Sequence, residues 1–324
     1  MALASGGCVT GHPGPGYYET RNQARYPDTA ALPNPPFPPT GLAMFEGRTG
    51  RILTWTDLME GVMWADAVIL GEQHDDAVGH SVQLAVVQFA FASDPYGAVS
   101  MEMLERNEQG IVDEYLAGTI DAATFTERTG STSWGGADGW RQWYLPIIDE
   151  ARRWRAPVVA ANAPREYVRM ARVDGWDALR ALPPEQQALF SLPMREASGA
   201  PRLRFEEFMR ESWAQHAPDS SETGGGPSAE AIAAAWRSQS LWDATMADSI
   251  ARELGPVWDR RRTIHLVGQF HSDFDGGLVQ QLRARDQFAR ILTVSLRPRT
   301  SLTLDPEDVG AADVVIYTGL WERP

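Results

Sequence analysis

Short apolar segments alternate with longer segments of helical periodicity from about residue 43 onward. Six segments are continuously apolar and several are rich in β-branched residues, which predicts strands buried on both faces of a sheet: 67–70, 98–101, 157–160, 263–267, 291–296 and 313–317. Amphipathic helices are predicted between them, at about 80–93, 105–117, 139–155 and 275–285. This alternation is typical of an α/β fold with a mostly parallel central sheet flanked by helices.

Residues 176–254 interrupt the alternation. This segment shows helical patterns at 201–216 and 228–254, separated by a loop rich in Ser and Gly at 219–227. We therefore predict an all-helical insertion, or lid, between two strands of the sheet.

Residues 1–42 differ in composition from the rest of the chain. They are dense in Pro and Gly, which favours an extended tether, and the α/β domain is predicted at 43–324. Small residues lead into Cys8, as at the end of a lipoprotein signal sequence, although the charged and apolar parts of such a signal do not precede them. Cys8 is thus either a lipidation site or an exposed thiol without a role.

The amino-acid composition argues against several kinds of partner and catalytic site. The chain has 324 residues and a formal net charge of −14, and all 29 basic residues are Arg. This balance argues against nucleic acid or an anionic membrane face as a partner, and the absence of Lys excludes a P-loop lysine and a pyridoxal Schiff base. One Cys excludes an internal disulfide, and no apolar run of about 18 residues is present.

Polar side chains follow four of the predicted strands. Glu72 and His74 come after the first, Glu102 ends the second, Asn162 the third, and His271 follows the fourth. Ligands of open parallel sheets bind outside the carboxyl ends of the strands, so these side chains are expected to share a crevice.

Imidazoles and carboxylates in one crevice suit two kinds of chemistry. They bind Zn, Fe, Mn or Ni, and a His beside a Glu equally serves as the base for a bound water. Glu72, His74, Glu102 and His271 are the candidate catalytic residues, and Glu72, His74 and His271 the candidate metal ligands. The alternative for each is a polar residue bonded to backbone at a strand end. No G-x-S-x-G, H-E-x-x-H or G-x-G-x-x-G motif follows a strand.

The ordered set of motifs resembles the ChaN-like haem-binding lipoprotein family, within a superfamily that includes Tiki proteases, TraB proteins and erythromycin esterases. The resemblance covers about residues 45–300. It rests on GEQH (71–74) with His80, SMEM (100–103), WYLP (143–146), AANAPR (160–165) and LVGQFH (266–271).

The resemblance implies a bacterial lipoprotein of the cell envelope, periplasmic or at the surface, with a role in haem or iron uptake. It implies haem as cofactor, a pocket shared between subunits and hence a homodimer, and a membrane link through the lipid anchor alone. Tyr144 or His80 would ligate the iron, unless Tyr144 simply packs beside Trp143, and Arg106 and Arg165 would bind the haem propionates.

Three hypotheses follow. The first is a haem-binding protein of the ChaN-like type. The second, drawn from the hydrolytic branches of the superfamily, is an esterase or peptidase that uses Glu72, His74, Glu102 and His271, with or without a divalent metal. The third is a module that binds another small molecule in the same crevice.

Overall fold

A seven-stranded sheet forms the centre of the computed structural model, which describes residues 42–216 and 226–319. Neighbouring strands are parallel, except that β1 runs antiparallel to β7. The strands are β1 (Ala43–Glu46), β2 (Ala67–Glu72), β3 (Gly97–Glu105), β4 (Val158–Asn162), β5 (Arg262–Gly268), β6 (Ile291–Arg297) and β7 (Val314–Tyr317). The six predicted strands are confirmed, and so is the mostly parallel sheet.

The strand order brings the carboxyl ends of four strands together. The order is β1-β7-β6-β2-β5-β3-β4, so β2, β5, β3 and β4 are consecutive neighbours. Glu72 at the end of β2 is in register with Gly268 at the end of β5. Pairing between β3 and β4 shifts register between Met101 and Glu105. The residues that follow these four strands therefore meet at one edge of the sheet.

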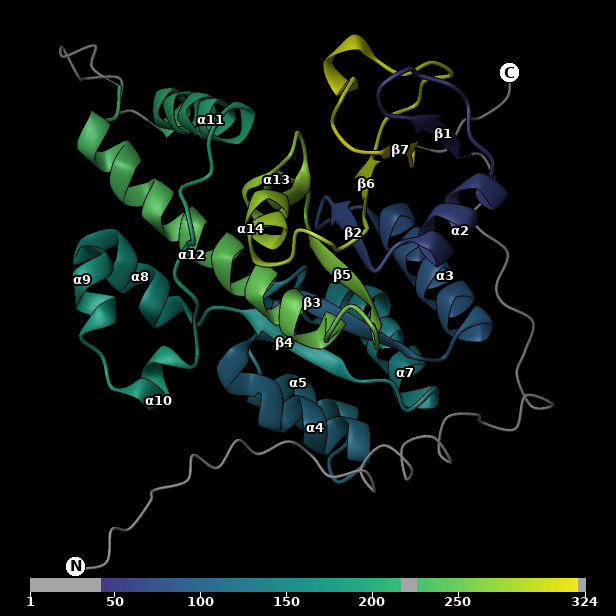
Figure 1. The fold of residues 1–324 in the computed structure, drawn as a ribbon, viewed down its shortest axis with the longest axis horizontal. Helices are drawn as coiled ribbons and strands as arrows, with labels where there is room; N and C mark the ends of the chain where they lie inside the picture. The colour runs from purple at the N-terminus through teal and green to yellow at the C-terminus, as the bar shows by residue number, and fades with distance from the viewer. Residues whose placement is uncertain (1–41, 217–225, 320–324) are drawn as a thin grey trace, which may run out of the picture. The chain divides into compact units, whose positions relative to one another are not determined.

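Helices cover both faces of the sheet (Figure 1). Helices α12 and α14 pack on β2, β4 and β5 through a shared apolar cluster, and α3 and α7 contact one another behind the strands. Strand β2 is buried along its whole length, as its continuous apolar sequence predicts. The α-helices before β4 are α2 (Trp55–Trp64), α3 (Ala77–Ser93), α4 (Gln109–Ala117), α5 (Ala122–Arg128), α6 (Gly136–Gly139) and α7 (Leu145–Arg153).

Between β4 and β5 the described residues form helices and no strand, which agrees with the predicted insertion. The helices of this segment are α8 (Arg165–Val173), α9 (Gly175–Arg180), α10 (Pro184–Gln187), α11 (Ala200–His216) and α12 (Ala229–Leu254); α13 (Gln269–Ser272) and α14 (Gly277–Arg285) follow β5. Helix α12 packs on α8, α14 and the sheet, whereas α11 meets α12 through a smaller cluster around Phe205 and Trp236.

Local sequence explains where several of these helices begin. The Asp76 carboxylate accepts a hydrogen bond from the backbone N–H of Val78 and caps α3, and the Ser228 hydroxyl caps α12 in the same way. The predicted helix at 105–117 begins later than expected, at Gln109, because β3 extends to Glu105. A π-helical turn at Trp140–Tyr144 precedes α7.

The predicted tether and the lipidation site Cys8 lie outside the residues that the structure describes. The lipid anchor, the cell-envelope location and the homodimer stay predictions. Among the described residues, no helix is long and apolar enough to cross a membrane.

Candidate functional site

Glu72 is a buried carboxylate that accepts hydrogen bonds from three side chains, and Nδ1 of His80 lies 3.6 Å from its Oε2 atom. Its Oε1 atom accepts hydrogen bonds from the Tyr144 hydroxyl (2.6 Å) and from Nδ1 of His74 (2.8 Å). Its Oε2 atom accepts one from the amide of Gln83 on α3 (2.5 Å). A carboxylate with these donors is fixed in position, and it orients the His74 ring.

The His74 ring is consequently poised to act through its other nitrogen. An ionised carboxylate only accepts hydrogen bonds, so Nδ1 carries the proton and Nε2 of the neutral ring holds a lone pair. The side chain is 40% exposed. Its Nε2 atom lies against Gly268, where a Cβ would come within 3.1 Å of it, a tight contact that glycine avoids. Burial lowers the pKa of His74, but the bond to Glu72 and the Glu102 charge outweigh it, and the pKa is raised.

His271 lies between two buried carboxylates. Its Nδ1 atom donates to Oδ1 of Asp243 on α12 (2.6 Å), and Nε2 lies 3.4 Å from Oε1 of Glu102. The other oxygen of Glu102 accepts a hydrogen bond from the backbone N–H of Gly268 (2.6 Å). Gly277 makes room for Asp243, because a Cβ there would lie 2.0 Å from its Oδ2 atom.

The charges of this cluster stabilise one another. Burial lowers the pKa of His271, but Glu102 and Asp243 outweigh burial and raise that pKa to about 10. Burial raises the pKa of Glu102, yet the adjacent His271 and His74 bring it down to about 2. His271 is therefore an imidazolium and Glu102 a carboxylate at neutral pH. Burial also raises the pKa of Asp243, against the effect of His271.

The structure thus brings the four candidate catalytic residues together at the edge where β2, β3 and β5 end. His74 presents its Nε2 atom on a half-exposed ring, whereas His271 offers a positive charge. The Asn162 amide donates to the backbone carbonyl of Glu102 (2.9 Å) and supports this edge from β4.

The two predicted iron ligands, Tyr144 and His80, are buried in the protein interior next to Glu72. Tyr144 is 0% exposed; burial and the Glu72 charge raise its pKa far above the ordinary value of 10. The buried His80 ring stacks on Trp143, with ring centroids 4.9 Å apart, and Nε2 of His80 donates to the carbonyl of His74 (3.2 Å). Both side chains support the Glu72–His74 pair from the protein interior.

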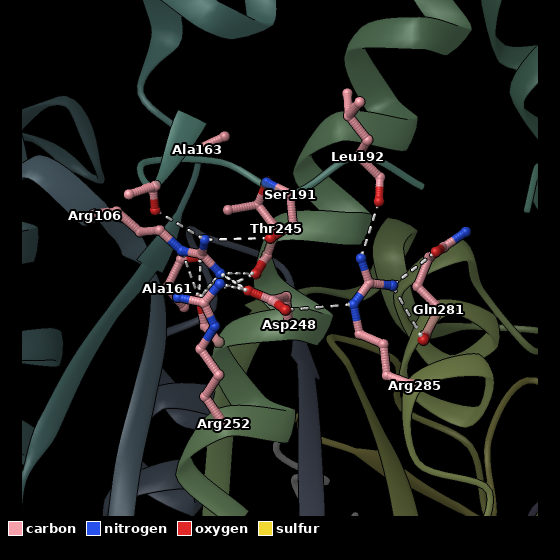
Figure 2. A network of polar contacts seen from close by, with 12 residues as sticks. Arg106, Ala161, Ala163, Ser191, Leu192, Thr245, Asp248, Arg252, Gln281 and Arg285 are labelled. Carbon is pink, nitrogen blue, oxygen red and sulfur yellow. Dashed lines mark hydrogen bonds and ion pairs between the residues drawn. The ribbon is translucent and has the colours of Figure 1, made fainter. Parts of the chain in front are cut away.

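Arg106, predicted to bind a propionate, points into the protein at a different place (Figure 2). Its guanidinium donates to Asp248 of α12 (2.7 Å), to the Thr245 carbonyl (2.9 Å) and to the Ser249 hydroxyl (2.8 Å). Arg252 and Arg285 also face Asp248. These contacts tie the end of β3 to α12.

A cavity of about 800 Å³ adjoins the cluster and is enclosed by the ends of β3 and β4 and by α8, α11 and α12. Glu102, Asn162 and Gln239 line it where it meets the His271 cluster, and Trp134 lines it beside His74, with ring centroids 4.8 Å apart. Most of the remaining wall is apolar: Val168, Phe205, Phe208, Met209 and Trp242. Arg165, the second predicted propionate ligand, also lines the cavity.

The predicted metal set does not form a recognisable site. Within residues 42–216 and 226–319, no group of three or more His, Cys, Asp or Glu is arranged to hold a metal ion. Glu72 and His74 bond to one another, and His271 is occupied by its two carboxylates.

Sequence reasoning missed Asp243 and Gln83, each of which orients a predicted residue. Both lie on helices, far from any strand end. Each is a polar residue on a buried helix face, and this break in an apolar face is the signal that marks them. Two further arginines of the cavity wall, Arg169 and Arg172, were missed as well.

One family model matches most of the chain. The model of a family described as haem-binding uptake, Tiki superfamily, ChaN matches residues 58–282. A solved structure of ChaN from Campylobacter jejuni, which describes cofacial haem binding, is 16% identical, with a TM-score of 0.61 over 86% of this chain and 97% of that one.

Two other solved structures are less similar. The type III effector HopBA1 is 10% identical, with a TM-score of 0.44 over 80% of this chain and 89% of that one. An erythromycin esterase EreC mutant is 14% identical, with a TM-score of 0.42 over 78% and 76%. Neither supports a functional argument at these scores. A search of curated protein sequences found no match.

Proposed function

Because the chain belongs to the ChaN family of haem-binding uptake proteins in the Tiki superfamily, we propose that it binds haem in the cavity beside Glu102. The observation that carries this proposal is the cavity itself, with an apolar and aromatic wall and arginine on one side. Its volume of about 800 Å³ falls in the range of pockets that enclose small ligands and cofactors.

The residues present fit a porphyrin. Haem is a flat apolar ring with two carboxylates on one edge, so its site needs apolar side chains for the ring and cations for the acid groups. Trp242, Phe205, Phe208 and Met209 supply the first, and Arg165 supplies the second.

We assign iron ligation to His74. Haem iron takes His, Tyr, Met or Cys as axial ligand. His74 is half-exposed beside Trp134 and holds a lone pair on Nε2, whereas Tyr144 and His80 are buried behind Glu72. The Glu72 bond to Nδ1 orients the ring and makes the imidazole a stronger ligand. When bound, the iron supplies a Lewis-acidic centre; Glu72, Tyr144 and Gln83 hold the imidazole in place for it.

Titration of the purified protein with hemin tests this function. We expect a Soret band at a wavelength different from that of free hemin. Its intensity should saturate at a fixed ratio of hemin to protein. Bovine serum albumin and heat-denatured protein serve as controls for non-specific uptake. If the spectrum stays that of free or albumin-like hemin at all ratios, the haem proposal is wrong.

A second candidate function is hydrolysis, and one observation favours it. The His74 ring, oriented by Glu72, and the His271 imidazolium, held by Glu102 and Asp243, lie at one sheet edge. His74 would accept the proton of an attacking water, and the His271 cation would stabilise negative charge that develops on a substrate oxygen.

A screen of ester and peptide substrates tests the hydrolase. We expect turnover by the wild type and a loss of at least about a hundredfold in His74→Ala, as typical for removal of a general base. Arg180→Gln, on the exposed surface of α9, is the control and should keep full activity. Turnover that is the same in His74→Ala and the wild type would mean that a contaminant or another site is responsible.

A further inference from the structure

Three arginines form a row along one face of α8. Arg165, Arg169 and Arg172 are spaced four and three residues apart, which places them on the same side of an α-helix. All three line the cavity. With a rise of about 1.5 Å per residue, their Cα atoms follow one another at about 6 Å and 4.5 Å along the helix axis.

The second and third arginines of this row lack protein partners. Arg165 donates to the Ser133 hydroxyl (3.0 Å) and lies 3.6 Å from Glu105. Within the described part of the chain, the guanidinium groups of Arg169 and Arg172 make no ion pair or hydrogen bond. This contrasts with Arg106, which is saturated by Asp248, Thr245 and Ser249. Both side chains are exposed on the cavity wall, so they are available to an anionic ligand from outside the protein.

The acidic residues of the same cavity are already engaged. Glu102 is paired with His271, and Glu105 with Arg165. Glu108 accepts hydrogen bonds from the backbone N–H groups of Glu105 and Gly130 (2.7 and 2.6 Å). The α8 side of the cavity therefore keeps two positive charges, and the wall around them is apolar.

We propose that Arg169 and Arg172, next to Arg165, form a subsite for two carboxylates of one ligand and make the cavity selective for porphyrins with free acid groups. This inference rests on the proposed haem function and adds the residues that determine specificity. A guanidinium binds a carboxylate through two parallel N–H···O bonds, so two arginines one helical turn apart suit the two acid groups on one edge of a porphyrin. Esterified ligands lose these bonds but keep the apolar contacts.

The experiment compares ligands with and without acid groups. Fluorescence and absorbance titrations use hemin, hemin dimethyl ester, metal-free protoporphyrin IX and its dimethyl ester in the same detergent buffer. The proteins are the wild type, the double variant Arg169→Gln/Arg172→Gln, and Arg180→Gln as a matched control on α9, where the arginine is exposed and pairs with Asp177.

We expect the wild type to bind each free acid about ten- to a hundredfold more tightly than its ester, in line with charge-assisted hydrogen bonds. The double variant should lose this preference while its affinity for both esters stays unchanged. Added salt should weaken binding of the acids and leave the esters unaffected. Arg180→Gln should behave as the wild type.

Two results would overturn the subsite: equal binding of acids and esters by the wild type, or an equal loss for acids and esters in the double variant, which indicates a structural role. A different result would show that the haem proposal itself is wrong: the wild type would then bind neither hemin nor its ester. Because protoporphyrin IX carries the acids without iron, it separates loss of the arginine subsite from loss of iron ligation.

Discussion

Replacement of His74 by alanine is expected to weaken hemin binding at least tenfold, about 1.4 kcal/mol, and to shift the Soret band toward that of unligated hemin. The reason is that Nε2 of His74 carries the lone pair that we propose binds the iron. The bond from Nδ1 to Glu72 both orients the ring and fixes the proton on Nδ1, which leaves the Nε2 lone pair free. Absorbance titration measures the affinity, and resonance Raman or electron paramagnetic resonance spectra report the axial ligand.

Acid should have the same effect on the wild type. A protonated imidazole does not bind metal, and the pKa of His74 lies above its ordinary value of 6.5. Hemin affinity should therefore fall as the pH decreases through that raised pKa, and the His74→Ala variant should lack this dependence. Added imidazole should restore the band in the variant. Met209→Leu, a substitution in the cavity wall, is the control. Loss of the band in this variant and not in His74→Ala would show that Met209 is the iron ligand.

Replacement of His271 by alanine is expected to cost about 3–5 kcal/mol of unfolding free energy at pH 6, as typical when one partner of a buried ion pair is removed. The substitution leaves the Glu102 and Asp243 carboxylates buried without their shared cation. Urea unfolding followed by circular dichroism measures the loss. Arg180→Ala, which removes one exposed ion pair, should change stability by about 0.5 kcal/mol or less.

The pH profile distinguishes this cause from simple loss of packing. His271 has its pKa raised from 6.5 to about 10, so its contribution is complete below pH 6.5 and is lost as the pH rises toward 10. Glu102 has its pKa lowered from 4.5 to about 2, so its contribution is present above pH 4.5 and is lost as the pH falls toward 2. The wild type should gain most from the pair between pH 4.5 and 6.5. In His271→Ala the decline above pH 6.5 should disappear; a parallel offset at every pH would show that the pair is not the cause.

The strands and the principal site residues could be predicted because both depend on local sequence. Continuous apolar segments mark β2 and β5; Glu72 ends the first strand and His271 lies just beyond the second. That these side chains meet depends on the strand order, in which β5 lies between β2 and β3, and no local pattern encodes that order.

The sequence does not indicate how deeply a predicted site residue is buried or which way its side chain points. The sequence places Tyr144 and Arg106 near the right elements, but it does not show that one lies behind Glu72 and the other faces Asp248 on α12. Asp243 and the α8 arginines are contributed by helices that reach the site only through tertiary packing, so a search limited to strand ends does not find them.

The central position of β5 also has a kinetic consequence. This strand enters the sheet between β2 and β3, although nearly two hundred residues separate it from β2 in sequence. Closing so long a loop is entropically costly, and topologies with such distant pairings fold slowly. Gly268 ends β5 and His271 follows it, so a nascent or partly folded chain that holds Glu72, His74 and Glu102 still lacks the His271 cation. Appearance of the ligand-bound spectrum during refolding should therefore not precede the insertion of β5 between β2 and β3.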